Sequence, residues 1–287
     1  MRHSIDKIIS FLPEIEKGIR CVTQTRPIEE IRLHLGQRVI YCFHGGYVSD
    51  SVIVDRDLLQ SVLDRATQRS CYATVDMLRR GYLILQGGHR LGVCGTGVYR
   101  DMKLRSLRDI SSLNIRIARD VRGFGSMVAD CLWTNPRSAL CIGPPGQGKT
   151  TLLRDVIRQL SQRFHQRVAV VDERQEIAAC VDGRPQFELG PTTDVLSAVG
   201  KAEGIEMLLR SMSPDWIALD EITAASDVQA MIHASYCGVK FLATAHAGGK
   251  EDLYARPMYR ELMSGRVFDL LFTIDQNREV RKEYLAI

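Results

Sequence analysis

Apolar residues in the first 120 positions mostly form short runs that end at glycine-containing turns, which is typical of strands. The expected strands cover residues 28–33, 39–43, 47–54, 82–85, 90–93, 96–99 and 109–119. Helical spacing of apolar positions instead marks residues 4–19, 57–66, 75–80 and 126–132. This mixture predicts a small α+β domain over residues 1–125.

The remainder of the chain alternates strand-like and helix-like segments, a pattern that predicts a mainly parallel sheet. The expected strands cover residues 138–142, 168–171, 216–219 and 241–243, followed by an antiparallel pair at 268–274 and 279–285. The expected helices cover residues 150–161, 202–211, 227–237 and 259–264. We therefore predict an α/β domain over residues 136–287, joined to the first domain by a linker at 126–135.

Composition and charge narrow the class of protein. With 287 residues, of which 45% are hydrophobic, the chain can bury a substantial core. Its net charge is +4, and its basic residues are interspersed with acidic ones rather than gathered in a basic block. Eight cysteines include no CxxC pair, which favours a reducing compartment over a zinc or redox site. No apolar run reaches membrane-spanning length, so we expect a cytoplasmic protein that meets a membrane only through partners.

A complete phosphate-binding loop follows the expected strand at 138–142. It consists of Gly143, Pro144, Pro145, Gly146, Gln147, Gly148, Lys149, Thr150 and Thr151, all of which we expect to bind nucleotide. The backbone N–H groups of such a loop surround a polyphosphate, and the helix that follows points its positive end at the same anion. Lys149 is expected to reach the β- and γ-phosphates and Thr150 to ligate Mg²⁺, so the motif predicts ATP and Mg²⁺ as ligands.

Two apolar runs of the second domain end in paired acids. Asp220 and Glu221 follow the strand at 216–219, and Asp172 and Glu173 end the strand at 168–171. Since parallel strands release their carboxyl ends at one edge of a sheet, these acids are expected beside the phosphate loop. We expect Asp220 to hold Mg²⁺, directly or through water, and Glu221 to polarise the attacking water. Glu173 offers a second carboxylate near the γ-phosphate; alternatively, it lies in a surface loop paired with Arg174.

Further polar residues could complete the site. Thr244 and His246 follow the strand at 241–243, where they can sense the γ-phosphate by hydrogen bonding; alternatively, His246 is satisfied locally. Four arginines precede the domain boundary: Arg105, Arg108, Arg116 and Arg119. An arginine from one domain or subunit can stabilise charge on the phosphates bound by its neighbour, although a solvated basic face has the same sequence signature.

The order of these motifs resembles that of type II and type IV secretion ATPases. There, the segments matching residues 143–151, 171–174, 219–221 and 243–246 are the Walker A motif, the Asp box, the Walker B motif and the His box. The last of these usually reads Thr-Gly-His, whereas this chain has Thr244-Ala245-His246. The resemblance is closer to the family of stage III sporulation protein AA from endospore-forming bacteria, and its most specific segments are residues 30–33, 87–92, 111–119, 171–174 with 176–179, and 201–204 with 208–215.

This resemblance implies a RecA-like P-loop ATPase domain behind the N-terminal domain, and a hexameric ring. It also implies that the ATPase energises a secretion-like channel between mother cell and forespore, with membrane proteins of the sporulation channel complex as partners. Arg116 and Arg119 match by position the N-terminal arginines that contact nucleotide in secretion ATPases.

Two other functions compete with a motor ATPase. A RecA-like ATPase that binds nucleic acid is the runner-up, but the near-neutral charge and the lack of a basic, aromatic groove count against it, and no direct nucleic-acid contact is expected. A docking ring that binds nucleotide without turnover is the third. Glu221 argues against it, because a site that only binds has no need for an acid that polarises water.

Overall fold

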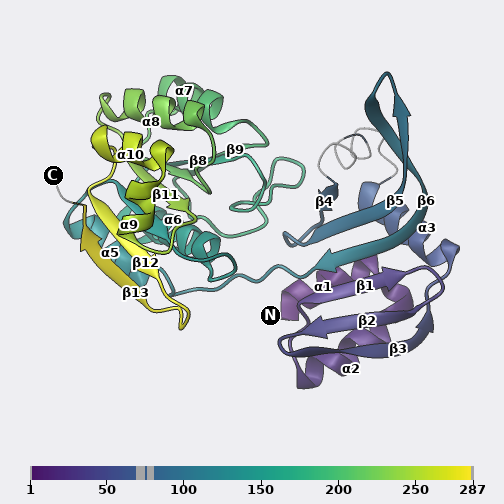
Figure 1. Cartoon of the computed structure of the whole chain (residues 1–287). Coiled ribbons are helices and arrows are strands. Elements are labelled where there is room, and N and C mark those ends of the chain that lie inside the picture. The colour runs from purple at the N-terminus through teal and green to yellow at the C-terminus, as the bar shows by residue number, and fades with distance from the viewer. Residues whose placement is uncertain (1, 69–74, 76–80, 286–287) are drawn as a thin grey trace. The chain divides into compact units, whose positions relative to one another are not determined.

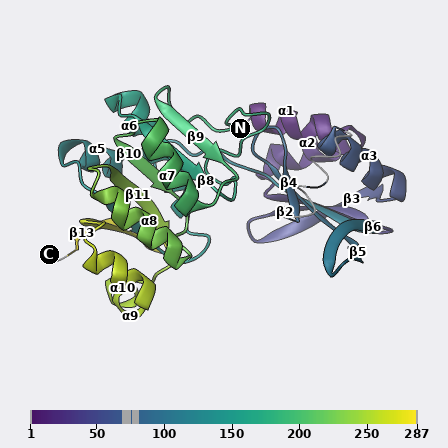
Figure 2. The same cartoon turned by 90° about the horizontal axis from the view of Figure 1, so that it is seen from above.

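The computed structural model describes residues 2–68, 75 and 81–285, which form two compact units, Met1–Arg119 and Asp120–Ile287 (Figures 1 and 2). The helix expected over residues 75–80 falls, except for Val75, outside the described residues. The segment expected to be a linker contains helix α5, Ser126–Thr134, whose apolar side packs with α6, Lys149–Phe164, in the core of the second unit.

The first unit is a six-stranded antiparallel sheet in the order β3-β2-β1-β6-β5-β4. Its strands are β1 (Glu30–His34), β2 (Arg38–Phe43), β3 (Gly46–Ile53), β4 (Tyr82–Ile84), β5 (Arg90–Arg100) and β6 (Lys103–Arg116). Its helices are α1 (Arg2–Phe11), a 3₁₀ turn (Pro13–Ile15), α2 (Glu16–Thr25) and α3 (Arg56–Thr67). Alternate strand residues such as Ile31 and Leu33 pack with the helices in one apolar core.

Two expectations for this unit were wrong in detail. The helix expected over residues 4–19 is interrupted at Pro13, since proline lacks an N–H and clashes with the preceding helical turn. The strands expected at 96–99 and 109–119 belong to a long hairpin, β5–β6, that turns through Asp101 and Met102 with φ angles of 52° and 58°. Two successive positive φ angles are typical of a two-residue type I′ turn, which these residue types did not signal.

The second unit contains a seven-stranded sheet in the order β13-β12-β7-β11-β10-β8-β9, with only β13 antiparallel to its neighbour. Its strands are β7 (Ala139–Ile142), β8 (Val168–Asp172), β9 (Thr193–Ser197), β10 (Trp216–Leu219), β11 (Lys240–Ala245), β12 (Leu270–Ile274) and β13 (Val280–Tyr284). Besides α5 and α6, the helices are α7 (Lys201–Ser211), α8 (Ala225–Ser235), α9 (Lys250–Ala255) and α10 (Pro257–Ser264).

Helices cover both faces of this parallel sheet. Successive strand residues point to opposite sides, so Ile217 and Leu219 join a core with α7, α8 and α10, while Trp216 and Ala218 join a core with α5 and α6. The inner strands β7, β8, β10 and β11 are therefore largely apolar on both faces, and most of their polar residues lie near the carboxyl ends. None of the helices that the structure describes is long and apolar enough to cross a bilayer.

Candidate nucleotide site

The phosphate-binding loop lies between the end of β7 at Ile142 and the start of α6 at Lys149. Gly146 and Gly148 have φ angles of 78° and 93°, which side chains rarely tolerate, so glycine gives the loop its shape. Pro144, Pro145 and Gly146 are exposed, whereas Gln147, Gly148, Thr150 and Thr151 are partly buried. The loop thus presents open backbone at the positive end of a helix of 16 residues.

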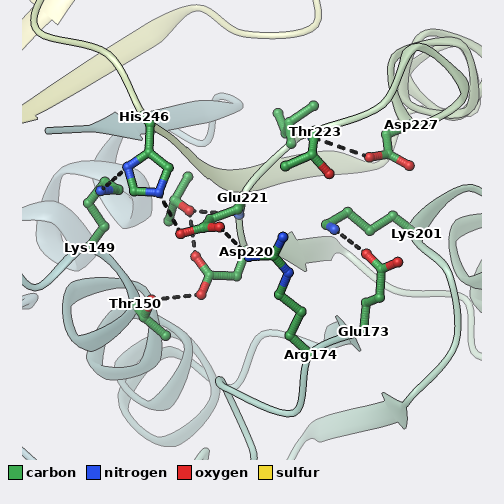
Figure 3. A network of polar contacts seen from close by, with 12 residues as sticks. Lys149, Thr150, Glu173, Arg174, Lys201, Asp220, Glu221, Thr223, Asp227 and His246 are labelled. Carbon is green, nitrogen blue, oxygen red and sulfur yellow. Dashed lines mark hydrogen bonds and ion pairs between the residues drawn. The ribbon is translucent and has the colours of Figure 1, made fainter. Parts of the chain in front are cut away.

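Lys149 lies at the centre of the site and is only 5% exposed. Its ammonium donates to the carbonyl oxygens of Gly143, at 2.9 Å, and Pro144, at 3.0 Å. Its Nζ also lies 2.9 Å from Nδ1 of His246 (Figure 3). Burial lowers the pKa of Lys149, and the negative charges of Glu221 and Asp220 oppose that shift.

His246 connects this lysine to the acid expected to act on water. An ammonium can only donate, so Nδ1 of His246 accepts, and in the neutral imidazole Nε2 then carries the proton. Nε2 lies 2.7 Å from Oε1 of Glu221 and donates to it. The two ring nitrogens thus join Lys149 and Glu221 through one side chain (Figure 3), and the expected part of His246 in sensing the γ-phosphate stays a prediction.

Asp220 is held by two hydroxyl groups. Thr150 Oγ1 donates to its Oδ2 at 2.7 Å, and Thr244 Oγ1 donates to its Oδ1 at 2.5 Å. Burial raises the pKa of Asp220, and the two hydrogen bonds offset only part of that effect. A carboxylate beside a threonine hydroxyl is the kind of hard oxygen set that Mg²⁺ prefers, and a cation there would relieve the cost of burying the charge. The residues at this position therefore fit Mg²⁺.

Glu221 directly follows Asp220 and has a left-handed backbone with φ of 51°. Its N–H donates to Thr244 Oγ1 at 2.9 Å, which ties it to the end of β11. Its carboxylate accepts from His246 on Oε1 and from Arg174 Nη1 on Oε2, the latter at 2.7 Å. Three contacts from two neighbouring strand ends therefore hold the residue in its strained conformation.

The acids at the end of β8 have different partners from those expected. Glu173 forms an ion pair with Lys201, the first residue of α7, and no contact of Glu173 with the Lys149–His246–Glu221 chain is seen among the described residues. Its expected part in hydrolysis stays a prediction. Arg174, considered from sequence only as a surface partner for Glu173, instead bonds Glu221. The sequence signal that could have marked Arg174 as a site residue is its position directly after the paired acids Asp172 and Glu173 at the end of β8.

The candidate arginines belong to the first unit and pair there with nearby acids. Arg116 lies 3.5 Å from Glu30, and Arg119 lies 3.6 Å from Glu29. Arg105 and Arg108 lie 3.9 Å and 3.5 Å from Asp101 and Asp109 on the β5–β6 hairpin. All four are at least 41% exposed, so these ion pairs are weak, and Arg119 also donates to the carbonyl oxygens of Pro27 and Ile28. Their role at a nucleotide stays a prediction.

Comparison with known proteins shows the family to which this chain belongs. A family model described as "Sporulation stage III, protein AA" matches residues 4–283. The stage III sporulation protein AA of Bacillus subtilis (strain 168) is 37% identical over 273 residues, which cover 92% of this chain and 89% of that protein. The resemblance noted from the motifs is thereby confirmed over nearly the whole chain.

Solved structures support the fold. The pilus retraction motor PilT, solved with bound ADP, matches with a TM-score of 0.62 at 14% identity, covering 89% of this chain and 76% of that chain. The ATPase DotB of Legionella pneumophila matches with a TM-score of 0.58 at 15% identity, covering 89% and 75%. At such identities the likeness shows the fold alone, and it confirms the expected α/β, RecA-like P-loop ATPase fold.

Proposed function

This chain belongs to the sporulation stage III protein AA family, and from that membership we propose that it is a Mg²⁺-dependent ATPase that energises a secretion-like channel complex during endospore formation. One observation carries the enzymatic part. A single edge of the parallel sheet brings together the phosphate-loop lysine, a carboxylate held by two hydroxyls and a glutamate held by a histidine and an arginine (Figure 3).

Nucleotide binding would use the loop and its lysine. Lys149 donates to two backbone carbonyls and His246, and phosphate oxygens are stronger acceptors that it can take in exchange. The loop N–H groups and the start of α6 add fixed positive potential. Thr150 and Asp220 would hold Mg²⁺, which when bound neutralises charge on the phosphates.

Glu221 would carry the chemical step. An ionised carboxylate has about four sites that accept hydrogen bonds, of which Arg174 and His246 use two. The remaining sites can orient a water molecule and accept its proton during attack on the γ-phosphate. Since His246 contacts both Lys149 and Glu221, a movement of the Lys149 side chain towards phosphate would change the hydrogen bond that His246 makes and, through it, the position of the Glu221 carboxylate.

We propose a homo-hexamer in which Arg116 or Arg119 of one domain or subunit completes the site of another. Its partners would be membrane proteins of the sporulation channel complex, with the ring cytoplasmic and peripheral to the membrane. The supporting observations are the family membership and the weak, exposed ion pairs of these two arginines.

The test separates binding from turnover. Lys149→Ala should weaken both ATP affinity and phosphate release, whereas Glu221→Gln should keep its affinity and lose on the order of 10² or more in kcat. Glu206→Gln is a matched control, because Glu206 is exposed on α7 and pairs with Arg210 of the same helix. Absence of Mg²⁺-dependent turnover in the unaltered protein, or normal turnover in Glu221→Gln, would contradict the proposal.

A further inference from the structure

The turn that follows β8 is built around one buried carboxylate. Asp172 is 2% exposed, and its two oxygens accept the backbone N–H groups of residues 176–179 at 2.8 to 3.2 Å. Gln175, just before these donors, and Ala179, the last of them, have positive φ angles of 55° and 49°. Four hydrogen bonds to a charged group hold the backbone in conformations that these residue types otherwise avoid, so the turn is rigid.

Two further contacts brace this turn. Arg154 of α6 donates to the carbonyl oxygens of Ile177, at 2.9 Å, and Glu176, at 2.8 Å. The helix that starts in the phosphate loop thereby supports the turn. On the other side, Glu173 pairs with Lys201, whose side chain is only 1% exposed. Residues 172–179 are thus anchored to α6 and to α7.

Arg174 leaves this braced turn towards Glu221 (Figure 3). We infer that Arg174 is a positioning residue that sets the carboxylate of Glu221 for hydrolysis, and that Asp172 and Glu173 act by holding the turn that presents Arg174. The inference rests on the proposed ATPase function and adds to it the role of Arg174, which lies outside the phosphate loop. Arg174 and His246 bind different oxygens of Glu221, so together they fix the plane of its carboxylate.

Arg174 is expected to matter because few other contacts hold the side chain of Glu221. Without Arg174, His246 is the one remaining tether on the carboxylate among the contacts seen in the described part of the chain, and a single hydrogen bond leaves the group free to rotate. A displacement of about 1 Å at a catalytic group can cost on the order of 10²-fold in rate. Nucleotide affinity should stay unchanged, because Lys149, Thr150 and the loop are untouched.

The experiment compares Arg174→Ala and Arg174→Lys with the matched control Arg167→Ala. Arg167 is also an arginine paired with an acid next to β10, namely Asp215, but at the opposite end of that strand. We expect Arg174→Ala to lower kcat by about 10- to 100-fold while ATP affinity changes little, with Arg174→Lys between it and the unaltered protein. In a Glu221→Gln background, Arg174→Ala should cause almost no further loss, since both act through one carboxylate.

A second measurement does not depend on turnover. Hydrogen exchange at the amides of residues 220–222 should accelerate in Arg174→Ala and not in Arg167→Ala, because Arg174 is one of the contacts that restrain Glu221. Unchanged exchange in Arg174→Ala would overturn the inference, as would full turnover in that variant. A loss of ATP affinity when Arg174→Ala is added to Glu221→Gln would also overturn it, because Arg174 would then be a phosphate ligand. Faster exchange in a protein without ATPase activity would refute the proposed function alone.

Discussion

Replacing Asp220 with asparagine should make the protein more stable while it abolishes Mg²⁺-dependent nucleotide binding. Asp220 is an acid whose pKa is raised by burial, so the folded protein holds its proton more tightly than the unfolded chain does. Its contribution to stability is therefore fully present below the ordinary value of 3.8 and is lost as pH rises through the raised pKa. At neutral pH the charged carboxylate weakens the fold.

The magnitude follows from proton linkage. Between 3.8 and the raised pKa, each pH unit costs up to about 1.4 kcal/mol of unfolding free energy, and asparagine removes that loss. The amide can preserve the local bonds, since its oxygen accepts from one threonine hydroxyl and its NH₂ group can donate to the other. A gain of 1 kcal/mol corresponds to a rise of about 2–4 °C in melting temperature for a domain of this size.

Thermal unfolding of the unaltered protein and of Asp220→Asn should be followed from pH 5 to pH 8 in buffers without divalent cations. The expected difference in unfolding free energy is about 1 kcal/mol. Asp215→Asn is a control of opposite sign, because Arg167 lowers the pKa of Asp215, and that carboxylate stabilises the fold above 3.8. Added Mg²⁺-ATP should raise the melting temperature of the unaltered protein and leave Asp220→Asn unmoved. A less stable Asp220→Asn at pH 7, or one that Mg²⁺-ATP still protects, would refute the reasoning.

Two other predictions test the scaffold and the assembly. Asp172→Ala should lower the free energy of unfolding by about 3 kcal/mol or more in urea titrations, since three buried N–H groups and a partly buried one lose their acceptor, whereas Asp194→Ala, at an exposed site, should be near neutral. An equal effect of the two substitutions would contradict the role given to Asp172. Specific ATPase activity should rise with protein concentration in step with ring formation seen by sedimentation, and Arg116→Ala or Arg119→Ala should reduce turnover more than nucleotide binding. Full activity in a demonstrably monomeric sample would exclude a shared site.

Local sequence patterns were sufficient to predict the central strands and the phosphate loop of the second unit. The strand runs that contain Leu140, Val170, Ile217 and Leu242 are apolar over at least three successive residues, because helices cover both faces of the sheet, and such runs are visible without a structure. The phosphate loop is equally local, since its glycines and Lys149 lie within a few residues of one another. Strand β9 escaped prediction because it is an edge strand of only partly buried, mixed residues.

The sequence by itself therefore marked the candidates for binding phosphate, holding Mg²⁺ and polarising water, because each belongs to a short motif at a strand end. Only the tertiary structure decided how they pair. Glu173 and Arg174 are adjacent, yet one reaches Lys201, 28 residues away, and the other Glu221, 47 residues away, while His246 meets a lysine 97 residues away. These partners are selected by the register of parallel strands and by the direction in which each side chain leaves its turn, and neither is encoded in the spacing of residues along the chain.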